Sequence, residues 1–375
     1  MAKKNNPTET LFPILDPRPT GLARLAAQAT HADDGHLITF RALQTRSILN
    51  KSISKRRLSF GYSINPYRGC EFACRYCFAR YTHEFLQPAP IITPPIGTLD
   101  IPQQPWALAF EREIYRKENA AWLLEQELRT LDLRGPNGTR EIAIGTATDP
   151  YQPIERRARI TRSLLEVFAR RQGLRLGIIT KSNLITRDID LLQQISAHNS
   201  LVIHITITTT DAALARKLEP RAPRPDLRFA AVQKLRTAGL RTGILCCPLL
   251  PGINDSLQQL EAVSSRAAAA GACFLGANPL FLKSCSRPTW LSFVREHFPA
   301  LTADYTRRYA RADFADAAYR ERMALILLQL CTKHGLGQRS KAALPTRDAY
   351  EPPPLERKGP TAVPTPTQAQ AKLFA

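Results

Sequence analysis

The chain has 375 residues, of which 44% are hydrophobic and 22% are charged. This length and apolar content exclude a peptide-like or wholly disordered protein and allow a sizeable core. No apolar run approaches the ~20 residues that span a bilayer, so no membrane association is expected. No apolar stretch follows the basic residues of positions 1–19, so no signal peptide is predicted. We therefore expect a cytoplasmic protein, acting as a monomer.

Basic residues outnumber acidic ones by 52 to 32, which gives a formal net charge of +20. Such an excess favours a polyanionic partner, most simply DNA or RNA, because each neutralised phosphate releases condensed counterions. The alternative is an arginine-rich composition that serves no anionic partner. Charge alone leaves both interpretations open.

Residues 1–55 are polar, carry scattered basic side chains and lack sustained periodicity, which indicates a basic, partly ordered N-terminal arm. From residue 56 to 285, short apolar runs alternate with amphipathic stretches, as in a parallel sheet whose strands are covered on both faces. The expected strands are Leu58–Ile64, Glu141–Thr146, Leu174–Thr180, Leu201–Thr208, Leu240–Cys247 and Ala272–Ala277. The expected helices are Arg159–Arg171, Leu184–Ala197, Leu227–Ala238 and Leu257–Ala270. About six β/α units predict an α/β fold, a parallel sheet or a partial (β/α)6 TIM-like barrel.

Two segments interrupt or follow this pattern. A proline-rich insertion at 88–105 precedes an expected long helix over 106–131. Residues 286–344 are expected to form a helical C-terminal extension, and 345–375 a proline-rich tail without a core. The helices of the extension are expected at Trp290–Phe298, Leu301–Tyr309 and Phe314–His334.

Three of the eight cysteines, Cys70, Cys74 and Cys77, lie within eight residues. Three thiolates on one short loop can converge on a soft metal but leave a coordination position vacant. A structural zinc site normally closes with a fourth ligand, and His83 is placed to supply it. The other interpretation is a [4Fe–4S] cluster held by three cysteines, with its fourth iron open to a cofactor.

The spacing C-x3-C-x2-C, with an aromatic residue before the last cysteine, resembles the motif of the radical S-adenosylmethionine (SAM) superfamily. The resemblance implies that Cys70, Cys74 and Cys77 hold a [4Fe–4S] cluster whose open iron binds SAM. It implies an external one-electron reductant and the cleavage of SAM to a 5′-deoxyadenosyl radical. Tyr76 is then expected to contact the adenine.

Further blocks are similar to the branch of this superfamily that contains spore photoproduct lyase, whose relatives are often labelled DNA repair photolyases. The blocks are Ser63–Cys70, Thr148–Glu155, Thr180–Ser182, Arg187–Asp188, Leu218–Pro223 and Pro251–Asp255. They cover nearly the whole predicted core. The hydrogen-donor cysteine of the true lyases corresponds to Thr146 here, which carries no thiol.

Each of these blocks follows a predicted strand at its carboxyl end, where β/α barrels build their sites. Thr148 and Asp149 suit the ammonium group of SAM, although Asp149 before a proline is also a turn former. Lys181 is a counter-ion for the carboxylate of SAM and Ser182 an additional donor, as the resemblance also implies. The alternative for Lys181 is a solvated loop position.

Other polar residues near these strand ends have two interpretations each. Arg221 forms an ion pair with Glu219 or faces a phosphate. Cys246 and Cys247 end the fifth strand, where a thiol can donate a hydrogen atom, although a buried cysteine is usually a small apolar residue.

The sequence therefore predicts a radical SAM enzyme acting on nucleic acid in the manner of a photoproduct lyase. The alternatives are a radical SAM enzyme acting on a small molecule or peptide, and a zinc-stabilised nucleic-acid-binding protein without catalysis. No catalytic residue beyond the cofactor ligands is predicted.

Overall fold

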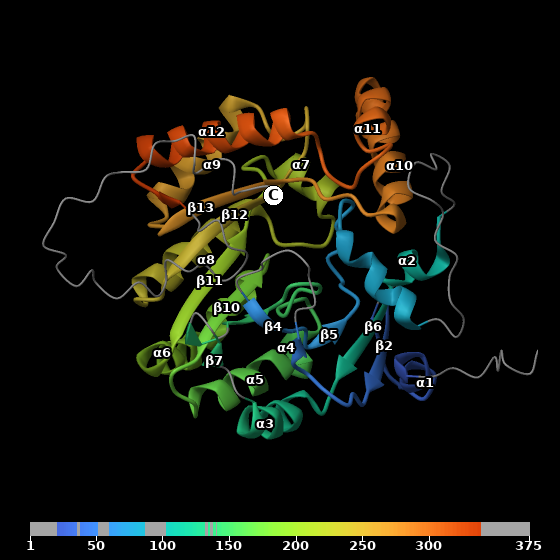
Figure 1. The fold of residues 1–375 in the computed structure, drawn as a ribbon, viewed down its shortest axis with the longest axis vertical. Helices are drawn as coiled ribbons and strands as arrows, with labels where there is room; N and C mark the ends of the chain where they lie inside the picture. Colours follow the sequence, from blue (N-terminus) through green and yellow to red (C-terminus); the bar gives the residue numbers. More distant parts are fainter. Residues whose placement is uncertain are drawn as a thin grey trace, which may run out of the picture.

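A computed structural model describes residues 21–35, 38–51, 60–86, 103–131, 134–135, 138–139 and 141–338. Its main element is an eight-stranded sheet with the order β14-β13-β12-β11-β10-β9-β4-β3 (Figure 1). The strands are β3 (Asn50–Lys51), β4 (Phe60–Ile64), β9 (Glu141–Ile144), β10 (Arg175–Thr180), β11 (Ser200–Thr206), β12 (Thr242–Leu249), β13 (Phe274–Pro279) and β14 (Gly337–Gln338). Pairing is parallel from β4 to β14 and antiparallel only between β3 and β4.

The six central strands, β4 and β9 to β13, are the six that the apolar runs predict. All four residues of β9 are buried, as are six of the seven residues of β11, because both faces of these strands are covered. Helices α6 and α8 pack against β11, and α8 and α9 pack against β12. The crossover elements are α4 (Glu155–Ala158), α5 (Ile160–Ala169), η2 (Asn183–Asp188), α6 (Ile189–His198), α7 (Ala212–Leu218), α8 (Pro225–Thr237) and α9 (Leu257–Ala269).

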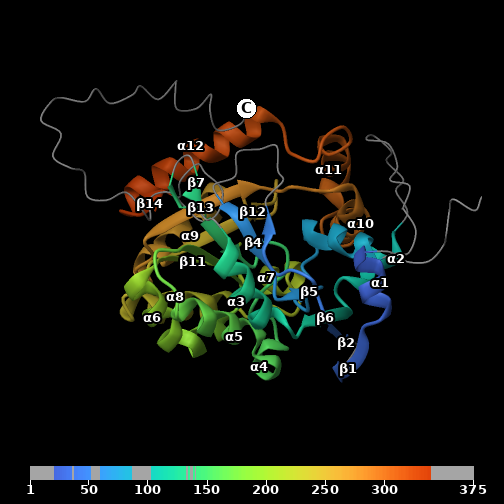
Figure 2. The same cartoon turned by 60° about the horizontal axis from the view of Figure 1, so that its bottom comes forward.

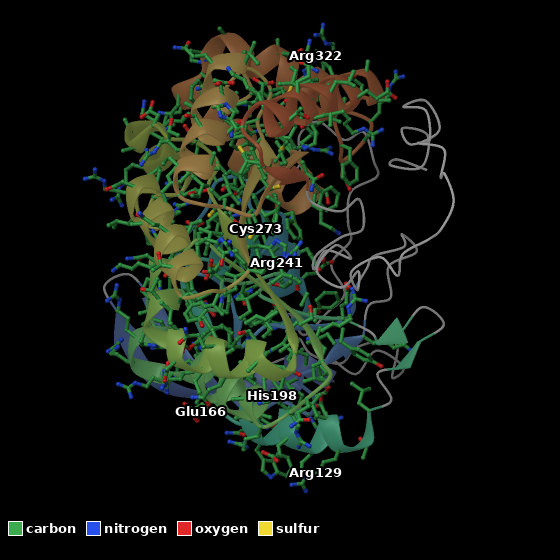
Figure 3. The ribbon with its side chains drawn as sticks, turned by 90° about the vertical axis from the view of Figure 1, so that its left-hand side faces the viewer. Arg129, Glu166, His198, Arg241, Cys273 and Arg322 are labelled. Atoms are coloured by element: carbon green, nitrogen blue, oxygen red, sulfur yellow. The ribbon has the colours of Figure 1, made fainter. Side chains whose placement is uncertain are left out.

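Spatial order follows chain order from β4 to β13, so every carboxyl end of the parallel strands meets at one edge of the sheet. The fold is thus an α/β partial barrel with a helical extension, as predicted. The opposite edge is marked in Figure 3 by Arg241 and Cys273, which immediately precede β12 and β13. Cys273 is therefore remote from the edge at which β/α barrels place their sites.

A second, four-stranded sheet was not predicted. Its order is β1-β2-β6-β5, and it lies beside α1 (Gly21–Ala27) in Figure 1. Its strands are β1 (Thr30–Gly35), β2 (Ile38–Leu43), β5 (Tyr67–Arg68) and β6 (Glu113–Lys117). The described part of the expected N-terminal arm therefore forms a helix and strands, and β2 pairs in parallel with β6. A two-stranded hairpin of β7 (Arg134–Gly135) and β8 (Gly138–Thr139) completes the sheets of the described chain.

The prediction of one helix over 106–131 is wrong. The segment forms α2 (Pro105–Ala109), β6 and α3 (Ala120–Thr130). Pairing with β2 on one side and β5 on the other overrides the helical pattern at β6, where Ile114 and Tyr115 are buried. Asn119 then begins α3, and its side chain donates to the carbonyl oxygen of Thr45 at 2.8 Å, which ties α3 to the N-terminal segment.

The three predicted C-terminal helices are present. Helix α12 packs on α9 and β13, as Figure 2 shows, and β14 follows it at the edge of the main sheet. The elements are η3 (Ser284–Ser286), α10 (Arg287–His297), η4 (Pro299–Leu301), α11 (Thr302–Arg308) and α12 (Ala317–Lys333). The predicted tail at 345–375 and most of the proline-rich insertion lie outside the described residues. Among the described helices, none has the length and apolarity to cross a membrane.

Candidate metal centre and cofactor site

The three clustered cysteines lie on the loop that follows β4 and β5, at the carboxyl edge of the barrel. Cys70 and Cys74 are buried, Cys77 is half-buried, and all three are free thiols. The turn before them requires glycine, because Gly69 has a φ of +82° and a Cβ there would approach the carbonyl oxygen of Glu113 to 2.5 Å. The cysteine loop ends at the 3-10 helix η1 (Phe78–Leu86), which begins directly after Cys77.

Side chains from three other segments hold the backbone of this cysteine loop. Arg80 donates to the carbonyl oxygen of Cys74 at 3.3 Å and pairs with Glu111 at 2.5 Å. Ser286, in η3, donates to the carbonyl oxygen of Cys77 at 2.7 Å. Gln152 accepts from the N–H of Glu71 at 2.8 Å and donates to the carbonyl oxygen of Gly69 at 3.2 Å. The carbonyl groups are thus bound from outside the loop.

The thiols fit an iron–sulfur cluster by their surroundings. Burial raises the pKa of the Cys70 thiol, and the backbone N–H of Asp149, which hydrogen-bonds to its sulfur, opposes that effect. Burial also raises the pKa of Cys77, while Arg80 and the N–H of Ala79 lower it. Three thiols on one short loop, of which Cys70 and Cys77 accept N–H hydrogen bonds, fit the donor set of a cluster with three cysteine ligands.

The structure does not assemble the alternative zinc site. The Nε2 atom of His83 lies 3.2 Å from the carbonyl oxygen of Glu113, and its ring packs edge-on against Phe110 and Tyr115. Within the described chain, no three histidine, cysteine or acidic side chains converge closely enough to hold a single metal ion. Burial lowers the pKa of His83 to about 3, so the ring is a neutral packing element of the second sheet.

Tyr76, the predicted adenine contact, is anchored by an acidic residue that sequence reasoning missed. Its hydroxyl donates to the carboxylate of Glu219, which also accepts from Thr208 at 3.2 Å and pairs with Arg228 at 2.5 Å. The side chains of Glu219 and Arg228 are 0% and 1% exposed. The loop after α7 is thereby joined to the cysteine loop.

The predicted ion pair of Arg221 with Glu219 is wrong, because Glu219 pairs with Arg228 instead. The Arg221 guanidinium donates to the carbonyl oxygens of Glu71 and Glu111, at 3.3 Å and 3.0 Å, and so supports the cysteine loop. A glutamate and an arginine nine positions apart, with three prolines between them, give no local signal of their pairing.

Asp149 joins the ends of two neighbouring strands. It accepts from the hydroxyl of Thr180 at 2.6 Å, from the N–H of Lys181 at 2.7 Å and from that of Tyr151 at 2.9 Å. The hydroxyl of Thr148 donates to the carbonyl oxygen of Tyr67 at 3.1 Å. The structure thus gives Thr148 and Asp149 structural roles at this edge, beside their predicted contact with SAM.

Lys181 and Tyr76 are brought together from positions far apart in the chain. The Nζ atom of Lys181 lies 5.8 Å from the centroid of the Tyr76 ring, within cation–π range. Ser182 is buried, and its hydroxyl accepts from the N–H of Leu184 at 3.2 Å, capping η2. The half-buried Lys181 therefore lies at the carboxyl edge of the barrel, where its charge acts on the thiols of Cys74 and Cys77.

The candidate hydrogen donors differ in position. The Sγ atom of Cys246 lies 3.6 Å from the carbonyl oxygen of Thr208 and is fully buried. Cys247 packs with Val202, Leu245 and Phe274 in a separate cluster. The hydroxyl of Thr146 accepts from the Asn65 side chain at 3.3 Å. Cys246 thus packs as a buried apolar residue, and burial raises the pKa of its thiol, with a further rise from Cys247 and Glu219.

A cysteine loop at the carboxyl edge of a six-stranded partial barrel, with a lysine and an anchored tyrosine beside it, defines the class of enzymes that use SAM and an iron–sulfur cluster. A family model of the Radical SAM superfamily matches residues 64–261, more than half of the chain. The chain belongs to this superfamily. The recognition made from the cysteine motif is thereby confirmed.

Two relatives and one solved structure illustrate the similarity. An uncharacterized protein of Mycobacterium bovis is 32% identical over 340 residues, which is 90% of this chain and 94% of the relative. One of Methanocaldococcus jannaschii is 26% identical over 194 residues, 52% of this chain and 62% of the relative. Spore photoproduct lyase complexed with dinucleoside spore photoproduct superposes with a TM-score of 0.58 at 15% identity, covering 84% and 87% of the two chains. At that identity the likeness concerns the fold.

Proposed function

We propose that Cys70, Cys74 and Cys77 hold a [4Fe–4S] cluster and that this enzyme binds SAM beside it. The observation that carries the proposal is the position of these three thiols on one short loop at the barrel edge, where the charge of Lys181 acts on Cys74 and Cys77 and its Nζ atom lies near the Tyr76 ring. When bound, the cluster supplies the electron for reductive cleavage of SAM, received from an external reductant, and so a 5′-deoxyadenosyl radical.

The residues of the chain position SAM for this step. The Lys181 ammonium binds the SAM carboxylate, the Ser182 hydroxyl adds a donor, and Thr148 with Asp149 faces the ammonium group. The Tyr76 ring packs beside the adenine, held in place because its hydroxyl is bound to Glu219. Burial of the ring and of the Glu219–Arg228 pair keeps water from this side of the cofactor.

As substrate we propose nucleic acid, DNA or RNA, in a reaction of the photoproduct-lyase kind. The support is the net charge of +20, the motif blocks, and the likeness of fold to spore photoproduct lyase. A small-molecule or peptide substrate is the second candidate. The basic side chains around the cysteine loop are bound to protein groups and are not directed at a polyanion; they are Arg80, Arg221 and Arg228. This observation favours the second candidate.

Anaerobic reconstitution tests the proposal. The full-length protein should take up about four irons per chain and, once reduced, release 5′-deoxyadenosine from SAM. Replacing Cys70, Cys74 or Cys77 by Ala should abolish both, whereas Cys273→Ala, at the opposite edge of the sheet, should leave both intact. Stoichiometric zinc without iron uptake would contradict the proposal.

A further inference from the structure

An aromatic and cationic surface adjoins the cysteine loop, and neither the cluster nor SAM accounts for it. We call it the aromatic–lysine face. It consists of Phe78, Tyr81, Phe85, Phe281, Phe314 and Lys283.

The rings of this face form a continuous row. Phe314 stacks on Phe281 at 4.5 Å between centroids, and Phe281 meets Phe78 at 5.7 Å. Phe78 stacks on Tyr81 at 6.5 Å, and Tyr81 meets Phe85 edge-on at 6.4 Å. The row therefore runs from Phe314, before α12, past Phe281, which follows the last core strand β13, to Phe85 near the end of η1.

The row crosses the open side of the barrel. In the sheet β4 and β13 are not neighbours, so the barrel is open between its first and last core strands. Phe78 directly follows Cys77, and Ser286, three residues beyond Lys283, is bonded to the carbonyl oxygen of Cys77. Segment η1 lies between β5 and α2, beside η3 (Figure 1). A molecule bound on the aromatic–lysine face would therefore lie next to the cysteine loop.

Two properties of the face indicate a ligand. Phe78 and Phe85 are 37% and 57% exposed, although large aromatic rings gain most from burial. The Nζ atom of Lys283 lies 4.4 Å from the Tyr81 centroid and 5.9 Å from that of Phe281, so a cation is held between the rings.

We propose that the aromatic–lysine face binds unpaired bases of a single-stranded or locally opened nucleic acid, with Lys283 at a backbone phosphate. Exposed rings interleaved with a cation match the alternation of bases and phosphates, because every base offers a π face and every phosphate a charge. Paired bases have no free face, so duplex does not fit. The inference deepens the proposed function and rests on its nucleic-acid part.

The test measures binding of labelled oligonucleotides to the reconstituted full-length protein. An oligo(dT) of about 12 nucleotides should bind more tightly than an abasic strand or a duplex of the same length, because only the first offers free bases. Phe85→Ala should weaken oligo(dT) binding roughly fivefold to a hundredfold, corresponding to the ~1–3 kcal/mol measured for base stacking. Phe85→Trp should restore it.

Matched controls come from remote exposed positions. Trp122, on α3, is 64% exposed, and Trp122→Ala should leave the affinity unchanged. Lys283→Ala should reduce the slope of log affinity against log salt by about 0.7, the contribution of one single-strand phosphate contact. Lys234→Ala, on the exposed side of α8, should not change that slope. Iron content and thermal melting identify any variant that has not folded.

The outcomes separate the two proposals. Equal oligo(dT) affinity in Phe85→Ala and Trp122→Ala would overturn the aromatic–lysine face and leave nucleic acid as substrate. Equal affinity for the abasic strand and for oligo(dT) would also overturn the aromatic–lysine face and leave nucleic acid as substrate. If the reconstituted protein cleaves SAM but binds none of the three probes at ~50 mM salt, the nucleic-acid substrate itself is wrong, and the face with it.

Discussion

The buried pair of Glu219 and Arg228 is expected to be a major contributor to the stability of the site. Both side chains are inaccessible to water, and Arg228 also donates to the carbonyl oxygens of Pro223 and Thr206, at 2.7 Å and 3.1 Å. Arg228→Met leaves Glu219 buried without its cation. Removing one partner of such a pair costs about 3–5 kcal/mol of the free energy of unfolding, because the remaining charge is uncompensated.

Urea denaturation of the cluster-free protein measures this effect. The control is the pair of Arg224 and Asp226 in the same segment, with side chains 61% and 47% exposed at 3.1 Å, so Arg224→Met should cost less than about 1 kcal/mol. The double variant Arg228→Met with Glu219→Gln should lose less than the sum of the single variants, since it leaves no buried charge. Equal losses for Arg228→Met and Arg224→Met would refute the reasoning.

Two further predictions concern Lys181 and Lys117. Lys181→Ala should weaken SAM binding roughly tenfold to a hundredfold, measured by equilibrium binding, because a hydrogen bond to a charged group contributes ~1.5–3 kcal/mol; unchanged affinity at full iron content would remove Lys181 from the site. Burial lowers the pKa of Lys117, in β6, to about 7, and Arg68 adds to the shift. Between pH 7 and the ordinary lysine value the unfolded chain holds a proton that the folded chain does not, so stability should rise with pH in that window. From pH 7 to 10 the rise should be about 3–4 kcal/mol in the cluster-free protein and absent in Lys117→Met, and a variant that retains it would contradict this assignment.

The barrel and the cysteine motif were open to prediction because their signals are local. Each core strand is a short apolar run, and an amphipathic helix follows most of them, so the pattern carries both the element type and the chain order. The motif Cys70, Cys74 and Cys77 needs only the spacing along one loop. That the loop lies at the carboxyl edge follows from its position after the first core strand.

The second sheet and the helix break at β6 were not open to prediction in this way. Strand β6 exists because β2 and β5 pair with it from distant parts of the chain, and its own residues also suit a helix. The periodicity of a segment indicates which face of it can be buried. Which strands its backbone pairs with depends on the packing of segments that are distant in the sequence.

The pairing of charged side chains also depends on the tertiary structure and not on local sequence patterns. The sequence by itself determined that Tyr76 and Lys181 lie at strand ends on the same edge, and that the chain belongs with enzymes of this motif. Only the tertiary structure decided that Glu219 binds Tyr76 and Arg228, that Arg221 supports the cysteine loop, and that His83 faces the second sheet. Hydrophobic pattern and motif spacing act over a few residues along the chain, whereas an ion pair depends on distances across the folded barrel, which local patterns do not encode.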